Sequence, residues 1–153
     1  MYDIIALSKQ GDYVLKLLKG IIMQYISGWQ ALNIQSEQGH IADWHSNVYF
    51  KDFKPTKMYQ YDENSPLKML GIKKRFIPFL QESHFVASYA RAIADLVYLD
   101  KTAQLRYCAR DFLNDEEKQE LFSYLKIINQ TKNVENFIKL ELASLYLKDK
   151  NNA

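Results

Sequence analysis

The sequence predicts a single, mainly all-α domain over residues 1–153: a helical bundle of about six helices. Glycine and proline are scarce, with 5 and 3 residues, so few positions suit the tight turns of a many-stranded fold. Apolar residues recur at spacings of three and four in several segments, which is the period of an amphipathic helix. A length of 153 residues with 48% hydrophobic residues is ordinary for one domain with its own core.

Two helices are expected in the first third of the chain. The first covers residues 13–26, where apolar residues follow the helical period, and Gly28–Asn33 closes it. Ser36 is a suitable N-cap for the second helix, which runs to about Phe50. Residues 47–64 contain many aromatic residues without a clear helical period, and they predict either a short hairpin that pairs VYFKDF with KMYQY or an irregular aromatic loop.

The middle of the chain contains the predicted centre of the fold. Ser65 and Pro66 predict a short helix that ends at Leu70, with Gly71 as its left-handed terminator. After a basic cluster at 73–75 comes Ser83–Leu113, which is apolar on most sides of a helix except for one narrow polar stripe. That stripe consists of His84, Ser88, Arg91, Asp95, Tyr98, Thr102 and Arg106. We expect it to face solvent or a ligand, and we expect the helix to bend or restart at Asp100, whose carboxylate falls on the apolar side.

The last part of the chain predicts two further helices. Asn114 and Glu117 have the spacing of a capping box, and acidic residues fill the first turn after them. The last helix covers Val134–Leu147, and the polar residues 148–153 are expected to form a frayed tail.

Charge and cysteine content limit the compartment and the partners. The net charge of +2 is too small to indicate nucleic-acid binding by itself. Charged residues interrupt the amino-terminal segment before a membrane span is reached, and the segment lacks the layout of a signal peptide. A single cysteine, Cys108, excludes an internal disulfide and fits a reducing compartment. We therefore expect a cytoplasmic protein without membrane partners.

The sequence contains no strong catalytic or cofactor motif. His40, Asp43 and His45 could suggest a metal site, but histidines five apart point to different faces of a helix. His84 with Ser88 has base-and-hydroxyl spacing, yet no orienting carboxylate can be identified. No phosphate-binding glycine loop or dinucleotide fingerprint is present, and Cys108 is best interpreted as a buried structural thiol. We expect no enzyme activity, no cofactor and no metal.

Protein binding is the function that the residue types favour most. Tyrosine and arginine often carry interface energy, and the aromatic segment is rimmed by acids that suit a basic partner. The predicted partner-binding residues are Asp52, Tyr59, Tyr61, Asp62, Glu63, Arg91, Asp95 and Arg106. In general character the chain resembles the small cytoplasmic immunity proteins of bacterial toxin systems, which neutralise a toxin by direct binding. The alternative is a nucleic-acid-associated helical subunit that uses an Arg, Lys and Tyr surface, although Arg91 and Asp95 would partly neutralise each other.

Overall fold

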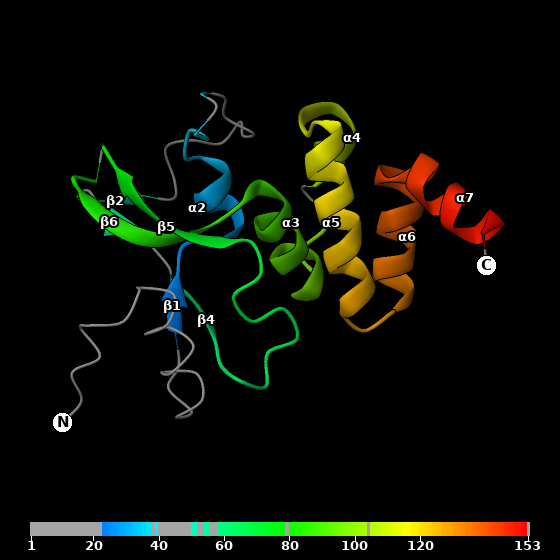
Figure 1. The fold of residues 1–153 in the computed structure, drawn as a ribbon, viewed down its shortest axis with the longest axis horizontal. Helices are drawn as coiled ribbons and strands as arrows, with labels where there is room; N and C mark the ends of the chain where they lie inside the picture. The colour runs from blue at the N-terminus through cyan, green and yellow to red at the C-terminus, as the bar shows by residue number, and fades with distance from the viewer. Residues whose placement is uncertain are drawn as a thin grey trace.

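The protein combines strands in its amino-terminal half with helices in its carboxyl-terminal half (Figure 1). The computed structural model describes residues 23–37, 39, 50–51, 54–55, 58–78, 80–103 and 105–152. Within these ranges lie six helices and three antiparallel pairs of strands. The expectation of an all-α bundle is therefore wrong, and the fold is a mixture of α and β structure.

Four of the strands form two antiparallel pairs, which one isolated bridge connects. β1 (Met23–Tyr25) pairs with β4 (Tyr59–Tyr61), and β5 (Ile72–Ile77) pairs with β6 (Glu82–Ala87). Ile26 joins the two pairs, because its N–H donates to the carbonyl oxygen of Phe85 at 2.8 Å and its own carbonyl accepts from Ala87 at 2.9 Å. This bridge places the residue after β1 beside β6. The remaining pair, β2 (Phe50–Lys51) with β3 (Lys54–Pro55), is a minimal hairpin.

Several segments that were predicted to be helical contain these strands or turns instead. The helix expected over 13–26 is wrong at its end, since residues 23–25 form β1, and residues 13–22 lie outside the described ranges. α2 (Gly28–Leu32) lies where that helix was expected to close. The helix expected from Ser36 falls mostly on residues outside the described ranges, and the described residues 36 and 37 are not helical. Residues 65–70 form turns instead of the predicted short helix, although Gly71 does have a positive φ of 73°.

The aromatic segment 47–64 forms neither of the two predicted arrangements as stated. A short hairpin is present at 50–55, but the KMYQY half pairs through β4 with β1, which is more than thirty positions away. Similarly, the predicted helix from Ser83 begins only at Tyr89, because 82–87 belong to β6. The backbone of β6 is bonded to β5 on one side and to Ile26 on the other, and helical periodicity reports neither of these strand partners.

The helical half agrees better with the sequence. α3 (Tyr89–Tyr98) starts at the N-cap Ser88, and the chain turns at Asp100 with a φ of 60°, so the predicted break there is confirmed. α4 (Cys108–Phe112) follows. α5 (Asp115–Ile127) begins with the predicted capping box of Asn114 and Glu117. α6 (Lys132–Glu141) and α7 (Ala143–Asn151) divide the helix expected over Val134–Leu147 at Leu142, and α7 includes residues 148–151 of the expected frayed tail.

α3 lies at the centre of the fold (Figure 1). It packs against α5 and α6 on the helical side and against α2 and β6 on the strand side. Its small and aliphatic residues are completely covered, with Ala90, Ala92, Ala94 and Leu96 at 0% exposure. Because both flanks of α3 are covered, its charged residues Arg91 and Asp95 also meet other elements rather than water. This placement determines the candidate site.

Candidate functional site

Arg91 and Asp95 form a buried ion pair on α3. They are one helical turn apart, and the Arg91 Nε donates to the Asp95 Oδ1 at 2.9 Å. Arg91 is 2% exposed and Asp95 is 6% exposed. The expectation that both face solvent on a polar stripe is therefore wrong. Arg91 and Asp95 face β1 and the loop before β5, which the sequence pattern of one helix does not report.

The carboxylate of Asp95 joins α3 to the beginning of the described chain. Its Oδ2 accepts hydrogen bonds from the Tyr25 hydroxyl at 2.7 Å and from the Ser27 hydroxyl at 2.6 Å. Tyr25 comes from β1, and Ser27 is the residue that precedes α2. A buried carboxylate is stable only if its oxygens are bonded, and these three donors meet that need.

The guanidinium of Arg91 holds the loop that connects β4 with β5. Its Nη1 donates to the carbonyl oxygens of Leu67, Lys68 and Leu70 at 3.3, 2.8 and 2.6 Å. Its Nη2 donates to the Tyr25 hydroxyl at 3.1 Å. A planar group with five N–H donors suits this many acceptors better than an ammonium would. Arg91 is thus a fixed structural centre, and its charge is already matched by Asp95.

A small pocket opens beside the ion pair. It has a volume of about 90 Å³. We call it the tyrosine pocket, and it is lined by Tyr25, Tyr59, Gln60, Tyr61, Ser65, Pro66, Leu67, Arg91, Asp95, Tyr98 and Leu99. The Tyr25 ring lies 6.0 Å from that of Tyr59 and 5.5 Å, edge to face, from that of Tyr61. Two residues at the end of α3 are open to solvent, since Tyr98 is 51% and Leu99 is 44% exposed.

Two phenols of this pocket, those of Tyr25 and Tyr59, remain neutral at ordinary pH. Burial, followed by the negative charge of Asp95, raises the pKa of Tyr59 to about 12. The same two causes raise the pKa of Tyr25 further. Neutral phenols that hold their protons this strongly are poorly suited to general base catalysis near pH 7. The pocket is better suited to receiving an apolar or aromatic group than to proton transfer.

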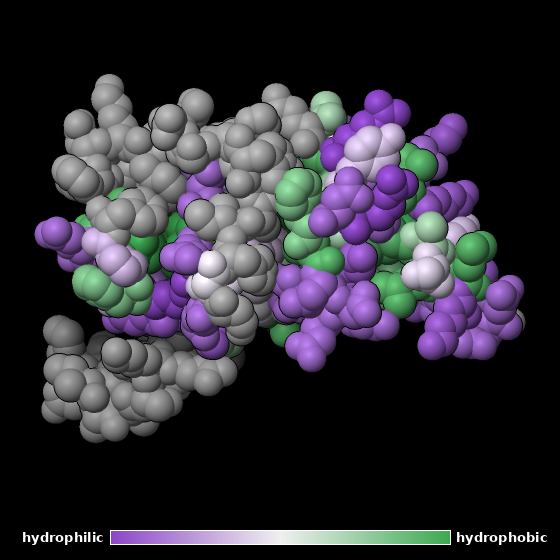
Figure 2. Space-filling model, turned by 90° about the horizontal axis from the view of Figure 1, so that it is seen from above, coloured by the Kyte–Doolittle hydropathy of each residue, from purple (hydrophilic) through white to green (hydrophobic). Residues whose placement is uncertain are grey.

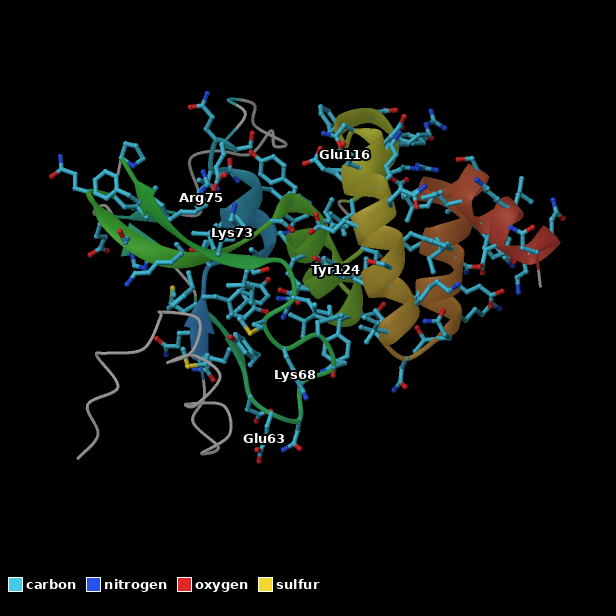
Figure 3. The ribbon with its side chains drawn as sticks, in the orientation of Figure 1. Glu63, Lys68, Lys73, Arg75, Glu116 and Tyr124 are labelled. Carbon is cyan, nitrogen blue, oxygen red and sulfur yellow. The ribbon has the colours of Figure 1, made fainter. Side chains whose placement is uncertain are left out.

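The structure brings together half of the predicted partner-binding residues. Tyr59, Tyr61, Arg91 and Asp95 all line the tyrosine pocket, although Tyr61 is itself 2% exposed. Asp62 and Glu63 directly follow β4, and Figure 3 shows Glu63 at the tip of this loop. The Asp62 Oδ1 accepts from the N–H of Asn64 at 2.8 Å and so shapes the turn.

The other two predicted residues lie elsewhere or are not described. Arg106 lines a separate pocket of about 300 Å³ with Phe137, Leu140 and Glu141. Its guanidinium lies 5.5 Å from the ring of Tyr107. Asp52 lies outside the described residues. The predicted stripe is therefore not one surface, and its two arginines have different environments.

Sequence reasoning missed Tyr25 and Ser27. Both were assigned to a helix or its end, whereas they provide two of the three donors to Asp95. One signal could have indicated them. The segments MQY at 23–25 and YQY at 59–61 both alternate large apolar or aromatic residues with glutamine, which is the pattern of paired strands with one buried face.

A larger groove lies between β5 and the start of α5. Its volume is about 370 Å³. Figure 3 shows Lys73 and Arg75 projecting from β5, and Glu116 from the first turn of α5. Glu117 and Glu120 also line the groove, and Glu37 forms ion pairs with Lys73 at 3.3 Å and with Arg75 at 3.9 Å. The charges of this groove are mixed, which disfavours a phosphate backbone as its ligand.

The weaker chemical candidates have ordinary environments. The Ser88 hydroxyl donates to Glu120 at 2.6 Å while it caps α3, and the His84 Nε2 lies 2.7 Å from Glu82. Cys108 is buried, and burial together with Glu141 raises the pKa of its thiol.

Figure 2 shows hydrophobic side chains in small groups among hydrophilic ones over the helical half.

Among the described residues no group of three His, Cys, Asp or Glu side chains is placed to hold a metal ion. His40, Asp43 and His45 lie outside the described ranges. No helix in the described part of the chain has the length and apolar character needed to cross a membrane.

Comparison of the chain with protein-family models, with curated proteins and with solved structures finds no match.

Proposed function

We propose that this chain is a protein-binding module and that the tyrosine pocket is the centre of its interface. The observation that carries the proposal is the contrast within the pocket. Its floor is fixed by the Arg91–Asp95 network, whereas Tyr98 and Leu99 beside it are open to solvent. Interfaces often have this form, in which a preorganised pocket with tyrosine walls receives one anchor side chain of the partner.

The size and charge of the pocket favour a particular kind of partner. A volume of about 90 Å³ suits one apolar or aromatic side chain rather than a cofactor. Asp62 and Glu63 follow β4 beside the pocket, and they would favour basic residues next to the anchor. Arg91 is matched by Asp95 and lacks the exposure that a phosphate ligand would require. These features support protein binding over nucleic-acid binding.

The most specific form of the proposal is an immunity or antitoxin role, in which the chain neutralises a bacterial toxin by direct binding. Its support is the acidic pair Asp62 and Glu63, which follows β4 and suits a basic toxin surface, together with the small size of the chain. No enzymatic step is part of this proposal, since the phenols and the thiol hold their protons firmly.

Affinity capture with matched variants tests the proposal. The tagged protein is incubated with lysate of its source, with and without nuclease, and the captured proteins are quantified by mass spectrometry. Tyr98→Ala should reduce recovery of a stoichiometric partner by about tenfold or more, which is the effect of a hot-spot residue. Leu147→Ala is the control, because Leu147 is 59% exposed on α7 and is not part of the pocket.

Three outcomes would contradict the proposal. Equal losses with both variants would remove the pocket from the interface, and recovery that depends on nucleic acid would favour the alternative function. Failure of the captured partner to inhibit growth when it is expressed alone would reject the toxin-neutralising role while leaving protein binding intact.

A further inference from the structure

β5 pairs with β6 alone among the described strands, so its other edge is free within the part of the chain that the structure describes. The β5–β6 hairpin projects away from the helices (Figure 1), and three of its six β5 residues are exposed, including Phe76 at 61%. An open edge of this kind presents unpaired backbone donors and acceptors to any extended chain that approaches it.

The hydrogen bonds of β6 show which way its residues face. The carbonyl of Phe85 and the N–H of Ala87 are bonded to Ile26, on the β1 side. Backbone groups of successive residues in a strand point to opposite edges. His84 and Val86 therefore direct their N–H and C=O groups toward β5.

The register identifies the backbone N–H and C=O groups of β5 that point away from β6. The register partners of those two β6 residues are Arg75 and Lys73, so these two face β6. The alternate residues, Lys74 and Phe76, consequently direct their N–H and C=O groups to the outer edge. Among the described residues neither has a backbone partner there. Lys74 and Phe76 thus form a two-residue docking position for an added strand.

The side chains at this edge define the chemistry of the added strand. Lys74 lies 5.8 Å from the ring of Phe85 and has no carboxylate within ion-pair distance in the described part of the chain. Phe76 lies on the same face of the strand, two positions on. On the opposite face, Lys73 and Arg75 share the single carboxylate of Glu37. The edge has excess positive charge beside one exposed aromatic ring.

This charge disfavours a second copy of the chain as the occupant. Antiparallel pairing of two β5 edges would place the Lys73–Arg75 cluster of one copy against that of the other. Like charges directly opposite each other destabilise a strand pair. Lysine on an edge strand is also a known means of preventing self-association.

We propose that the outer edge of β5 binds an extended acidic segment of a partner protein by strand addition. The segment places an acidic residue next to Lys74 and an apolar residue, two positions along, next to Phe76. Main-chain hydrogen bonds to these two residues provide affinity, and charge provides selectivity. This surface is independent of the tyrosine pocket.

Hydrogen exchange with defined peptides tests the inference. The full chain is mixed with a blocked peptide of alternating glutamate and valine, and amide exchange is followed by NMR. The expected result is slower exchange at the Lys74 and Phe76 amides, with no effect from the matched peptide of alternating lysine and valine. Equal protection by the lysine peptide, protection that is confined to other amides, or absence of any protection would overturn the inference.

A proline variant separates strand addition from simple charge attraction. Lys74→Pro removes one outward N–H without removing a bond to β6, and proline is tolerated on edge strands. Lys74→Pro should weaken binding of the acidic peptide by about tenfold relative to the native chain. This loss should be larger than the one caused by the charge-only variant Lys74→Ala. Circular dichroism confirms that both variants fold. Equal binding by the two variants would overturn strand addition, as would a concentration-dependent dimer that Lys74→Pro abolishes.

Discussion

The hydrogen bonds that tie the strand half to α3 span much more of the sequence than the helix caps of the helical half do. In the strand half, Tyr25 and Ser27 bind Asp95 across 70 and 68 positions of sequence, and Arg91 binds Tyr25 across 66. In the helical half, the caps of α5 and α6 are hydrogen bonds between residues three positions apart. The polar contacts of the strand half therefore span 66 to 70 positions, whereas the helical half combines local caps with one buried carboxylate, Glu141, which accepts from the N–H groups of Tyr107 and Ala109 across 34 and 32 positions.

The largest expected effect comes from breaking the long-range network. Arg91→Met leaves the Asp95 carboxylate buried without its cation, so the free energy of unfolding should fall by about 3–5 kcal/mol. Urea unfolding followed by circular dichroism measures the change. The control is Lys126→Met, which breaks an exposed ion pair with Asp149 and should cost less than about 1 kcal/mol. Similar costs for the two variants would remove the contrast between the halves.

The second effect concerns Gly71, the residue before β5, which lies against Arg91 and Tyr124 of the helical half. A Cβ at this residue would lie 2.8 Å from the Arg91 Cβ and 2.8 Å from the Tyr124 hydroxyl, and φ is +73°. Gly71→Ala should therefore cost about 2–4 kcal/mol, from overpacking and left-handed strain together. Gly39→Ala is the matched case, since its φ is +90° but the nearest atom, on Gln35, is 3.8 Å away. Gly39→Ala should cost about 1 kcal/mol. Equal destabilisation by the two variants would show that Gly71 is not tightly packed.

A smaller effect is expected when a local signal is removed. Asn114→Ala deletes the side chain that accepts from the Glu117 N–H at 2.8 Å, and it should lower the free energy of unfolding by about 1 kcal/mol. Asn114→Asp retains an acceptor at the same position and should stay within about 0.5 kcal/mol of the native chain. Chemical denaturation of both variants measures the difference. A loss of several kcal/mol on Asn114→Ala would mean that the helical half also depends on a single polar contact.

The smallest effect is expected at Tyr59. Its phenol changes the free energy of unfolding only at alkaline pH. Burial raises its pKa from 10.0 to about 12, so the folded state retains this proton after the unfolded state has lost it. The resulting stability is complete below pH 10 and is lost as the pH rises toward 12. Tyr59→Phe should therefore reduce the slope of unfolding free energy against pH in this window. An unchanged slope would place the Tyr59 hydroxyl in water.

The sequence predicts those parts of the molecule that depend on near neighbours. The capping box at Asn114, the break at Asp100 and the left-handed Gly71 were all predicted, because each depends on residues within a few positions. Residues 83–87 of β6 were predicted to be helical, since apolar spacing reports neither the hairpin partner β5 nor the distant Ile26 that hold their backbone. The interface residues show the same limit. Tyr59, Tyr61, Arg91 and Asp95 were identified by type, whereas their burial and their convergence depend on the distant Tyr25 and Ser27.

The way in which Arg91 holds the loop before β5 has a consequence for evolution and design. Its guanidinium binds the carbonyl oxygens of Leu67, Lys68 and Leu70, and every amino acid has such an oxygen. Lys68 and Leu70 have exposed side chains, and Lys68 has a φ of 46°, which glycine or asparagine would also adopt. Mutations at these two positions can therefore accumulate without loss of the anchor. The loop next to the tyrosine pocket can change its side chains, and with them its choice of partner, while its backbone path stays the same.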